Sequence, residues 1–331
     1  MSAPIPLRAR LSRVVLGLGA ALALSTGFSA VGAGDELAGS APQLPQFIPS
    51  NFRPGQRIDN PYFPLREGFT YRYAGKVLND AGKFVPSPDH MRVTHLHKQV
   101  DDIQVLVVDD NVFLNGLLEE TTQDYYAQDV HGNVWYMGEF ETDFVRDRNG
   151  KVIKVTHPDS WQGGVNGAKP GFIMLAHPSV GADYFQEHAP GVALDTAKVT
   201  AVDLTPTVEG KVYHHVLLTK EFSRLEPTIL DFKWYAPRIG MVLEREFDNG
   251  KLDAESRFVG ITPNQSGTQV GALDHGAPDQ ERTELAVVLP QGLGNDAAGA
   301  MTMAKTMAHA AMPVASPADG HAPLPDLAPL F

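Results

Sequence analysis

The sequence contains no cysteine among its 331 residues. This absence excludes disulfide bonds, thiol catalysis, thiolate metal sites and the attachment of a lipid to a cysteine. A chain of this length can bury enough apolar surface without disulfides, so the missing cysteines remain compatible with export from the cytoplasm.

Basic residues are also scarce and are scattered singly along the chain. The sequence has 27 lysines and arginines against 39 aspartates and glutamates, which gives a formal net charge of −12. Nucleic-acid binding needs a clustered basic surface. We therefore expect no nucleic-acid partner.

Helical periodicity is missing as well: residues 60–262 contain no apolar repeat of helical period longer than two turns. Glycine-bearing corners recur there between short apolar runs. Such corners suit hairpins because glycine, asparagine and aspartate adopt positive φ at little cost. The corners are Asn115-Gly116, residues 129–132, Asn149-Gly150 and residues 248–250.

These features predict a mainly β protein with a single large curved antiparallel sheet. A sheet of roughly nine to eleven strands twists too strongly to stay flat, so we expect a half-barrel or open barrel with a concave face. The stretch from Ser160 to Gly181 is too rich in glycine for a long helix. We expect it to form an excursion that covers the sheet or its mouth.

The N-terminal segment has the composition of a secretory signal. Arg8, Arg10 and Arg13 precede an apolar run over residues 14–28, and small residues then lead to Ala33. An apolar run of about 15 residues is shorter than the ~20 needed to cross a bilayer, so cleavage near Ala33 is predicted instead of a membrane anchor. We expect a periplasmic or secreted protein with no transmembrane segment after cleavage.

The mature chain divides by composition into three parts. Residues 34–58 read as an extended lead-in, and residues 59–262 hold the strand pattern of the β domain. Residues 263–331 are rich in alanine, proline and glycine, which predicts a disordered tail that could form one short helix.

Four segments carry a resemblance to known proteins: residues 60–65 (NPYFPL), 125–136 (YYAQDVHGNVWY), 210–216 (GKVYHHV) and 234–242 (WYAPRIGMV). Together they resemble uncharacterised exported bacterial proteins, and the last two are similar to the closing strands of half-barrel lipoprotein carriers of the LolA/LolB type. The resemblance implies a concave antiparallel sheet in an exported protein, and it supplies no catalytic residue. Related sequences often have glycine where this chain has Arg238, so we expect a less tight turn there.

Acidic and aromatic residues alternate along the strand predicted around residues 119–129. Side chains two apart share a face, which places Glu120, Asp124, Tyr126 and Gln128 together. Such a face could be a wet inner wall that holds a ligand, a proton or a calcium ion, or a solvated strand whose charges resist aggregation. The predicted ligand-binding residues are Glu120, Asp124, Tyr126, Gln128, Trp135, Glu139, Trp161, Tyr184 and Glu187.

Two of the aromatic residues in this set carry more specific expectations. Trp135 and its neighbour Tyr136 must face opposite sides of a strand. Trp161 stands at the start of the glycine-rich stretch, where we expect the mouth of a pocket.

Histidines offer a metal-binding alternative. His95 and His97 are two residues apart, so a strand would place both on one face. A zinc site needs three or four converging ligands, and this pair supplies two. The alternative to a metal site is a pair of polar residues at a sheet edge.

The leading hypothesis is a binding protein without a cofactor. Its concave face would hold a small amphipathic or lipid-like molecule, or an envelope protein. One alternative is a hydrolase that uses carboxylates from Asp124, Asp129, Glu139 or Glu187. The other is an envelope protein that binds a metal through His95 and His97.

Overall fold

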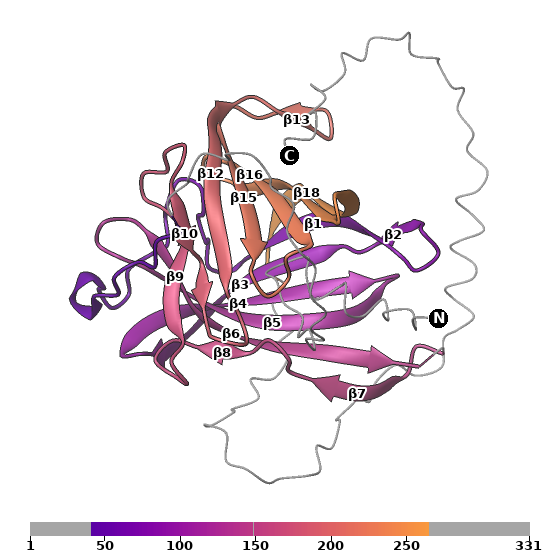
Figure 1. Cartoon of the computed structure of the whole chain (residues 1–331), viewed down its shortest axis with the longest axis horizontal. Coiled ribbons are helices and arrows are strands. Elements are labelled where there is room, and N and C mark those ends of the chain that lie inside the picture. The colour runs from indigo at the N-terminus through magenta and orange to yellow at the C-terminus, as the bar shows by residue number, and fades with distance from the viewer. Residues whose placement is uncertain (1–40, 148, 265–331) are drawn as a thin grey trace, which may run out of the picture. The chain divides into compact units, whose positions relative to one another are not determined.

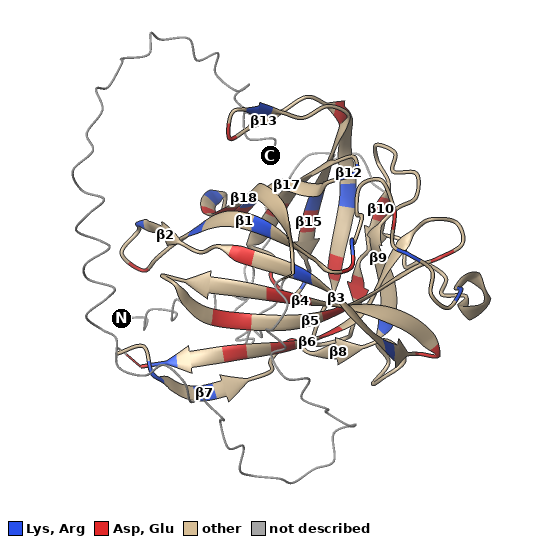
Figure 2. Cartoon of the chain, turned by 180° about the vertical axis from the view of Figure 1, so that it is seen from behind, with Lys and Arg blue, Asp and Glu red and all other residues tan. Residues whose placement is uncertain are grey.

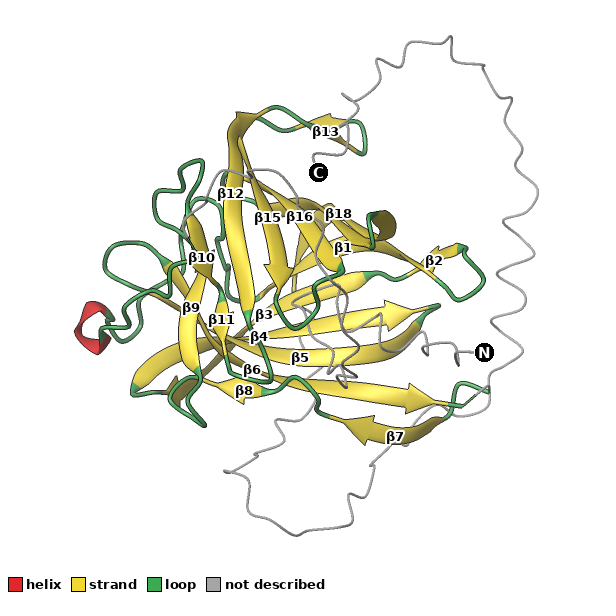
Figure 3. Cartoon of the chain, in the orientation of Figure 1, coloured by secondary structure: helices red, strands yellow, loops and turns green. Residues whose placement is uncertain are grey.

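The computed structural model describes residues 41–147 and 149–264, which form a mainly β structure (Figure 3). Within these ranges the one helical segment is a short 3-10 turn, η2 (Pro49–Asn51). No helix in this part of the chain is long and apolar enough to cross a membrane. The predicted signal peptide, the first residues of the lead-in and the tail beyond Asn264 lie outside the described residues.

Eighteen strands follow one another along the described chain. They are β1 (Phe69–Leu78), β2 (Phe84–Pro86), β3 (Asp89–Val100), β4 (Ile103–Leu114), β5 (Leu117–Gln128), β6 (Val134–Arg146), β7 (Val152–Thr156), β8 (Trp161–Gln162), β9 (Lys169–Met174), β10 (Asp183–Phe185), β11 (Glu187–His188), β12 (Asp195–Leu204), β13 (Thr207–Val208), β14 (Lys211–Val212), β15 (Val216–Ser223), β16 (Ile229–Ala236), β17 (Gly240–Asp248) and β18 (Lys251–Pro263).

Sixteen of these strands form one antiparallel sheet, and β13 and β14 pair separately as a small hairpin. The main path runs β10-β12-β15-β16-β17-β18-β1-β3-β4-β5-β6-β9-β11, with β2 added to β1 and with β7 and β8 added to β6. This is more strands than the sequence predicts, because several of the extra ones are only two to five residues long. Strands that short show no alternation of apolar and polar residues.

The two ends of the sheet are neighbours in the chain. β10 begins the path and β11 ends it, and the single residue Gln186 connects them. The backbone N–H of Gln186 donates a hydrogen bond to the carbonyl of Asp195, 2.8 Å away. The sheet is therefore nearly closed into a barrel with a seam at this point (Figure 1), which confirms and extends the predicted curved sheet.

The two faces of the sheet carry different apolar clusters. Tyr126 and Tyr136 stack with 5.0 Å between their ring centroids on the inner face, where strands from opposite sides of the barrel meet. Tyr125 and Trp135 belong to a separate cluster on the outer face, which the lead-in covers with Phe47. The predicted alternation along β5, and the opposite orientation of Trp135 and Tyr136, are confirmed.

A bulge in β6 changes which residues face inward. Tyr125 pairs with Gly138, whereas the next residue, Tyr126, pairs with Tyr136. The extra residue brings Tyr136 and Glu139, three apart, onto the same inner face. Gly138 has a φ of 139°, and a Cβ there would lie 2.6 Å from the carbonyl oxygen of Trp161, so only glycine fits the bulge.

The glycine-rich stretch after Ser160 joins the sheet. β8 pairs with β6 around Gly138, and β9 pairs with both β6 and β11. The expected cover over one end of the barrel comes instead from the residues around Asn60. The Asn60 amide donates to the carbonyls of Gly132 and Leu175, and its side-chain oxygen accepts the backbone N–H of Tyr62.

The turn between β16 and β17 stays tight, contrary to the expectation at Arg238. Ala236 pairs with Gly240, so three residues make the connection. Arg238 itself adopts the left-handed conformation with a φ of 66°. Its backbone N–H donates to the carbonyl of Pro61 at 2.6 Å, which ties the turn to the segment around Asn60.

Candidate functional site

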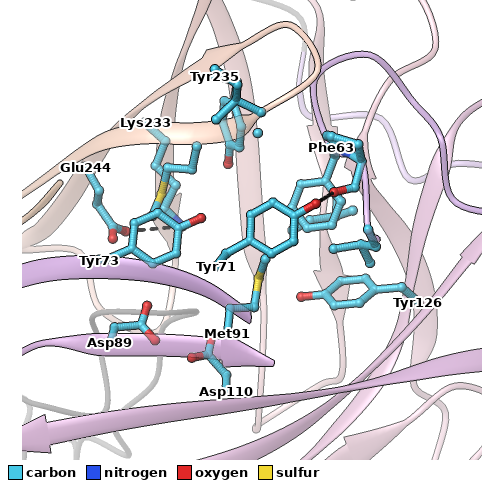
Figure 4. A pocket seen from close by; sticks show the side chains of 16 residues that line it. Phe63, Tyr71, Tyr73, Asp89, Met91, Asp110, Tyr126, Lys233, Tyr235 and Glu244 are labelled. Atoms are coloured by element: carbon cyan, nitrogen blue, oxygen red, sulfur yellow. Dashed lines mark hydrogen bonds and ion pairs between the residues drawn. The ribbon is translucent and has the colours of Figure 1, made fainter. Parts of the chain in front are cut away.

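A small cavity lies inside the barrel beneath residues 63–65 (Figure 4). Its volume is about 50 Å³, which is room for a few water molecules. Strands from distant parts of the sheet path converge on it. The lining residues are Phe63, Pro64, Leu65, Tyr71, Tyr73, Asp89, Met91, Asp110, Tyr126, Ile173, Lys233, Tyr235, Ile239, Gly240, Met241 and Glu244.

Four tyrosines form much of the wall. Tyr71 and Tyr73 reach inward from β1, Tyr126 from β5 and Tyr235 from β16, and all four are buried. The Tyr71 hydroxyl donates a hydrogen bond to the carbonyl of Pro64 at 2.6 Å, which holds residues 63–65 against the wall. Burial raises the pKa of Tyr73, Tyr126 and Tyr235 well above the usual value, so these hydroxyls stay protonated.

Asp89 of β3 and Asp110 of β4 form a buried carboxyl pair in the same cavity. Each is 3% exposed, and the two carboxyl groups lie close enough that each changes the pKa of the other. Burial raises the pKa of Asp89 well above its usual value, and the nearby charge of Asp110 raises it further. Two interacting carboxyl groups buried together do not both ionise readily, so the pair carries about one charge instead of two.

Lys233 of β16 supplies positive charge to this side of the interior. Its Nζ lies 3.0 Å from Glu221 Oε2 and 3.4 Å from Glu244 Oε1. Burial acts to lower the pKa of Lys233, but the charges of Glu221 and Glu244 outweigh burial and the pKa is raised. In the described part of the chain, Lys233 is the only lysine or arginine among the buried residues.

Several of the sequence-predicted residues meet in a second polar group, further along the barrel interior. The Tyr136 hydroxyl lies 2.6 Å from Asp124 Oδ1 and 2.8 Å from Glu139 Oε2. A hydroxyl donates only one proton, so one of the two carboxyl groups must itself be protonated and donate to the tyrosine oxygen. The Trp161 indole N–H donates to Glu187 Oε2 at 2.7 Å, and its ring packs edge-on against Tyr136.

Burial is the largest cause that raises the pKa of every carboxyl group in this second polar group. The effect holds for Asp124, Glu139 and Glu187, each well above its usual value. The raised pKa values favour the protonated form, in which these side chains can donate hydrogen bonds. Trp161 is 6% exposed, so the structure places it inside the barrel and not at a pocket mouth as expected.

Glu120 lies near one end of β5 with two other acids. Its carboxyl accepts the Thr122 hydroxyl at 3.0 Å. Carboxylate oxygens of Glu120, Glu141 and Asp143 all lie within 4.8 Å of one another, a spacing that could hold a metal ion. Acidic residues recur on the ribbons of β5 and β6 in Figure 2.

The remaining predicted residues have structural partners elsewhere. The Gln128 side-chain oxygen accepts hydrogen bonds from the backbone N–H groups of Asp59 and Asn60, so it anchors the segment that leads into residues 63–65. Trp135 lies on the outer face, where it packs against Phe172. The Tyr184 hydroxyl is buried and has no hydrogen-bond partner.

Asp129, a candidate of the hydrolase hypothesis, is committed to its own turn. Its two oxygens accept the backbone N–H groups of His131 and Asn133, the Asn133 amide and the Trp135 indole N–H. These four bonds occupy the carboxylate, which leaves it no free acceptor for a substrate or a water.

His95 and His97 lie on an exposed part of β3. The His95 side chain is 73% exposed and lies 3.2 Å from Glu67. His97 lines a second pocket beside the lead-in, with a volume of about 160 Å³. The group with metal-ligand spacing in the described residues contains neither histidine, so a metal site at His95 and His97 stays a prediction.

Of the residues that line the cavity, the sequence pattern predicted Tyr126 and missed the others. Signals for them do exist: Tyr71 and Tyr73 alternate along β1, Asp110 interrupts an apolar strand, and Lys233 stands between Phe232 and Trp234. A charge in the middle of an apolar strand marks a buried polar group that needs a partner. The sequence alone does not show which distant strands supply those partners.

The fold and the cavity define a class: a nearly closed antiparallel barrel with an acidic, tyrosine-walled interior. No protein-family model matches the chain, and no curated protein matches it. Two solved structures are similar to it. One comes from a Bacteroides fragilis protein assigned as exported, with a YmcC-like fold, at 14% identity and a TM-score of 0.32; the match covers 61% of this chain and 99% of that one.

The other structure comes from a Parabacteroides distasonis protein assigned as a lipoprotein. It is 10% identical with a TM-score of 0.28, and the match again covers 61% of this chain and 99% of that one. The similarity to lipoprotein carriers of the LolA/LolB type stays a prediction from the sequence.

Proposed function

We propose that this protein is an exported binding protein that holds a small amphipathic molecule in the barrel cavity. The observation that carries the proposal is a cavity with aromatic and apolar walls in which three carboxyl oxygens have no hydrogen-bond partner. These atoms are Asp89 Oδ1, Asp110 Oδ1 and Glu244 Oε2. Buried polar atoms are nearly always paired in folded proteins, so unpaired ones inside a cavity are suited to a ligand.

The cavity size narrows the class of ligand. About 50 Å³ is far less than the roughly 300 Å³ and more of pockets for drug-sized molecules. A long acyl chain does not fit this conformation. The ligand is therefore a compact molecule, or a larger one whose entry displaces the segment over residues 63–65.

Export rests on the N-terminal sequence. The basic start, the apolar run and the small residues before Ala33 have the order of a secretory signal. The ligand would then be met in the periplasm or outside the cell. Mass spectrometry of the mature chain purified from a bacterial envelope fraction would give the cleavage site directly.

Native mass spectrometry of the mature, untagged protein tests the binding proposal. We expect a mass excess over the polypeptide that disappears under denaturing conditions. Met91→Trp fills the cavity and should abolish this excess, whereas Leu96→Trp, on an exposed position of the same strand, should keep it. An excess that survives Met91→Trp would place the ligand elsewhere. No excess in the wild-type protein, together with no binding from a small-molecule library, would refute the proposal.

The Asp89–Asp110 pair favours one second candidate, a hydrolase. Two carboxyl groups that share a proton can act together, one activating water while the other donates a proton. This function requires substrate and water to reach the pair beneath residues 63–65. Turnover of chromogenic ester, glycoside or peptide substrates that is lost in both Asp89→Asn and Asp110→Asn would establish it.

A further inference from the structure

Three strands bring carboxyl groups to the same cavity. Asp89 comes from β3, Asp110 from β4 and Glu244 from β17, and they are 3%, 3% and 4% exposed. Each has one oxygen without a hydrogen-bond partner. In Figure 4 the carboxyl groups of Asp89 and Asp110 point into the space below Tyr73 and Met91.

The lining is short of positive charge. Lys233 is the one basic residue of the lining, which also contains three acids. Its ammonium group pairs with Glu244 and also with Glu221, which lies outside the lining. An anionic ligand would meet three carboxyl groups and would be repelled. A neutral ligand would leave the charge of the Asp89–Asp110 pair without compensation, which is costly in a buried site.

The walls suit a cation as well. Tyr71, Tyr73, Tyr126 and Tyr235 line the cavity, and the face of an aromatic ring attracts a positive charge. The chain already holds one ammonium group between buried carboxyl groups: Lys233 lies between Glu221 and Glu244 and lines the same cavity as Tyr235. The interior therefore provides the environment that a second ammonium group needs.

We infer that the cavity binds an organic ammonium ion, a small amine with an apolar body. Its charged nitrogen would lie against Asp89, Asp110 and Glu244. Its apolar part would lie against Met91 and the other apolar side chains of the lining. This inference rests on the proposed function, because it names the ligand class of the same cavity.

Amine binding should depend on pH. The groups that face the Asp89–Asp110 pair are Tyr73 from β1, Glu120 from β5, Lys233 from β16 and Glu244 from β17, with Asp109 next to the pair. A bound ammonium ion favours the ionised pair, so the shared proton leaves on binding. Affinity should rise by about tenfold per pH unit while one proton is released per ligand bound, as long as the amine stays charged.

The test compares probes of equal shape and different charge. Isothermal titration of the mature protein with ethylamine, ethanol and acetate, which are small enough for the cavity, varies only the charged group, and calcium chloride tests for a metal ion. We expect binding of the amine alone, tighter at pH 8 than at pH 6. Asp89→Asn and Asp110→Asn should each weaken it at least about tenfold, the loss of a charged hydrogen bond. Asp80→Asn, in an exposed turn, should leave it unchanged.

Glu244→Gln provides a second variant in case the aspartate variants unfold. Equal binding of the amine and the alcohol, or binding of calcium alone, would overturn the ammonium assignment and leave the cavity as a binding site. Unchanged amine affinity in all three carboxamide variants, with each folded by its thermal transition, would also overturn it. The proposed function fails separately, by the native mass measurement described above.

Discussion

Two regions of the barrel interior bury carboxyl groups by different means. The lysine region, on β12 and β15 to β17, places Lys233 between Glu221 and Glu244. The tyrosine region, on β5 and β6, has no buried cation in the described residues and joins Asp124 and Glu139 through the Tyr136 hydroxyl. A buried acid can thus be stabilised either by an opposite charge or by remaining protonated.

The two solutions differ in how they respond to pH. In the lysine region burial raises the pKa of Glu244 to about 7 and that of Asp195 to about 8, and Lys233 limits both rises. In the tyrosine region no such charge opposes burial, and the pKa of Glu139 is raised well above its usual value. The pKa values of Glu244 and Asp195 therefore lie near neutral pH, whereas burial in the tyrosine region favours the protonated form of Glu139.

The largest expected effect comes from removing the lysine. Lys233→Met leaves Glu221 and Glu244 buried without a counter-charge, which should lower the free energy of unfolding by about 3–5 kcal/mol. Urea unfolding measures it. Lys83→Met, at an exposed turn, should cost less than about 0.5 kcal/mol. Adding Glu221→Gln and Glu244→Gln to Lys233→Met should recover part of the loss; no recovery would mean that lost packing, not charge, causes it.

The next effect concerns pH. The pKa of Asp195 is about 8 in the folded state and ~3.9 when unfolded, so between these values the folded state holds a proton that the unfolded state has lost. Its contribution to stability is thus complete below about pH 4 and is lost as the pH rises towards 8. Asp195→Asn should make the decline of the unfolding free energy between pH 6 and pH 8 smaller by about 2 kcal/mol.

Denaturant unfolding at several pH values in that range gives the slope for each variant. Asp80→Asn serves as the surface control and should keep the wild-type slope. Parallel curves for Asp195→Asn and the wild type would show that Asp195 is ionised in the folded protein, contrary to its raised pKa.

A smaller loss is expected from Tyr136→Phe. The change removes the hydroxyl that contacts both Asp124 and Glu139, and leaving buried polar groups unpaired should cost about 1–3 kcal/mol. Tyr184→Phe is a matched control, because the Tyr184 hydroxyl is buried without a hydrogen-bond partner. The two variants should therefore differ in their unfolding midpoints, with Tyr184→Phe close to the wild type. Equal losses would show that ring packing and not the hydroxyl is responsible.

The smallest effect is at the turn between β16 and β17, which joins the strands of Lys233 and Glu244. Arg238 has a φ of 66°, a conformation that glycine adopts without strain. Arg238→Gly should stabilise the protein by about 0.5–1 kcal/mol. Arg224→Gly, on an exposed loop where the φ is not positive, should destabilise it by a similar amount, because glycine adds freedom to the unfolded chain. Thermal unfolding of both variants tests whether Arg238→Gly stabilises the protein and Arg224→Gly destabilises it.

The alternation of residues in the sequence correctly predicted which side chains of β5 share a face. The two-residue spacing placed Glu120, Asp124, Tyr126 and Gln128 on one side, and the structure agrees. It could not place Glu139, because the bulge at Gly138 shifts the alternation of β6. The bulge depends on the close contact between Gly138 and Trp161, so the alternation of residues along β6 does not reveal it.

The residues that line the cavity could not be predicted from local sequence pattern, for a different reason. Asp110 and Lys233 come from strands that are far apart in the chain and in the order of the sheet. They approach one another only because the sheet closes, and closure is set by long-range pairing. The sequence therefore predicted a curved sheet and an acidic inner face, and it missed the cavity where Asp89, Asp110 and Glu244 meet.

The connection at Gln186 has a consequence for the integrity of the whole sheet. Because this one residue links the first strand of the path to the last, cutting the chain there would release two strand edges at once. Exposed edges recruit strands from other molecules, so a proteolytic nick at this point would favour domain-swapped or aggregated forms.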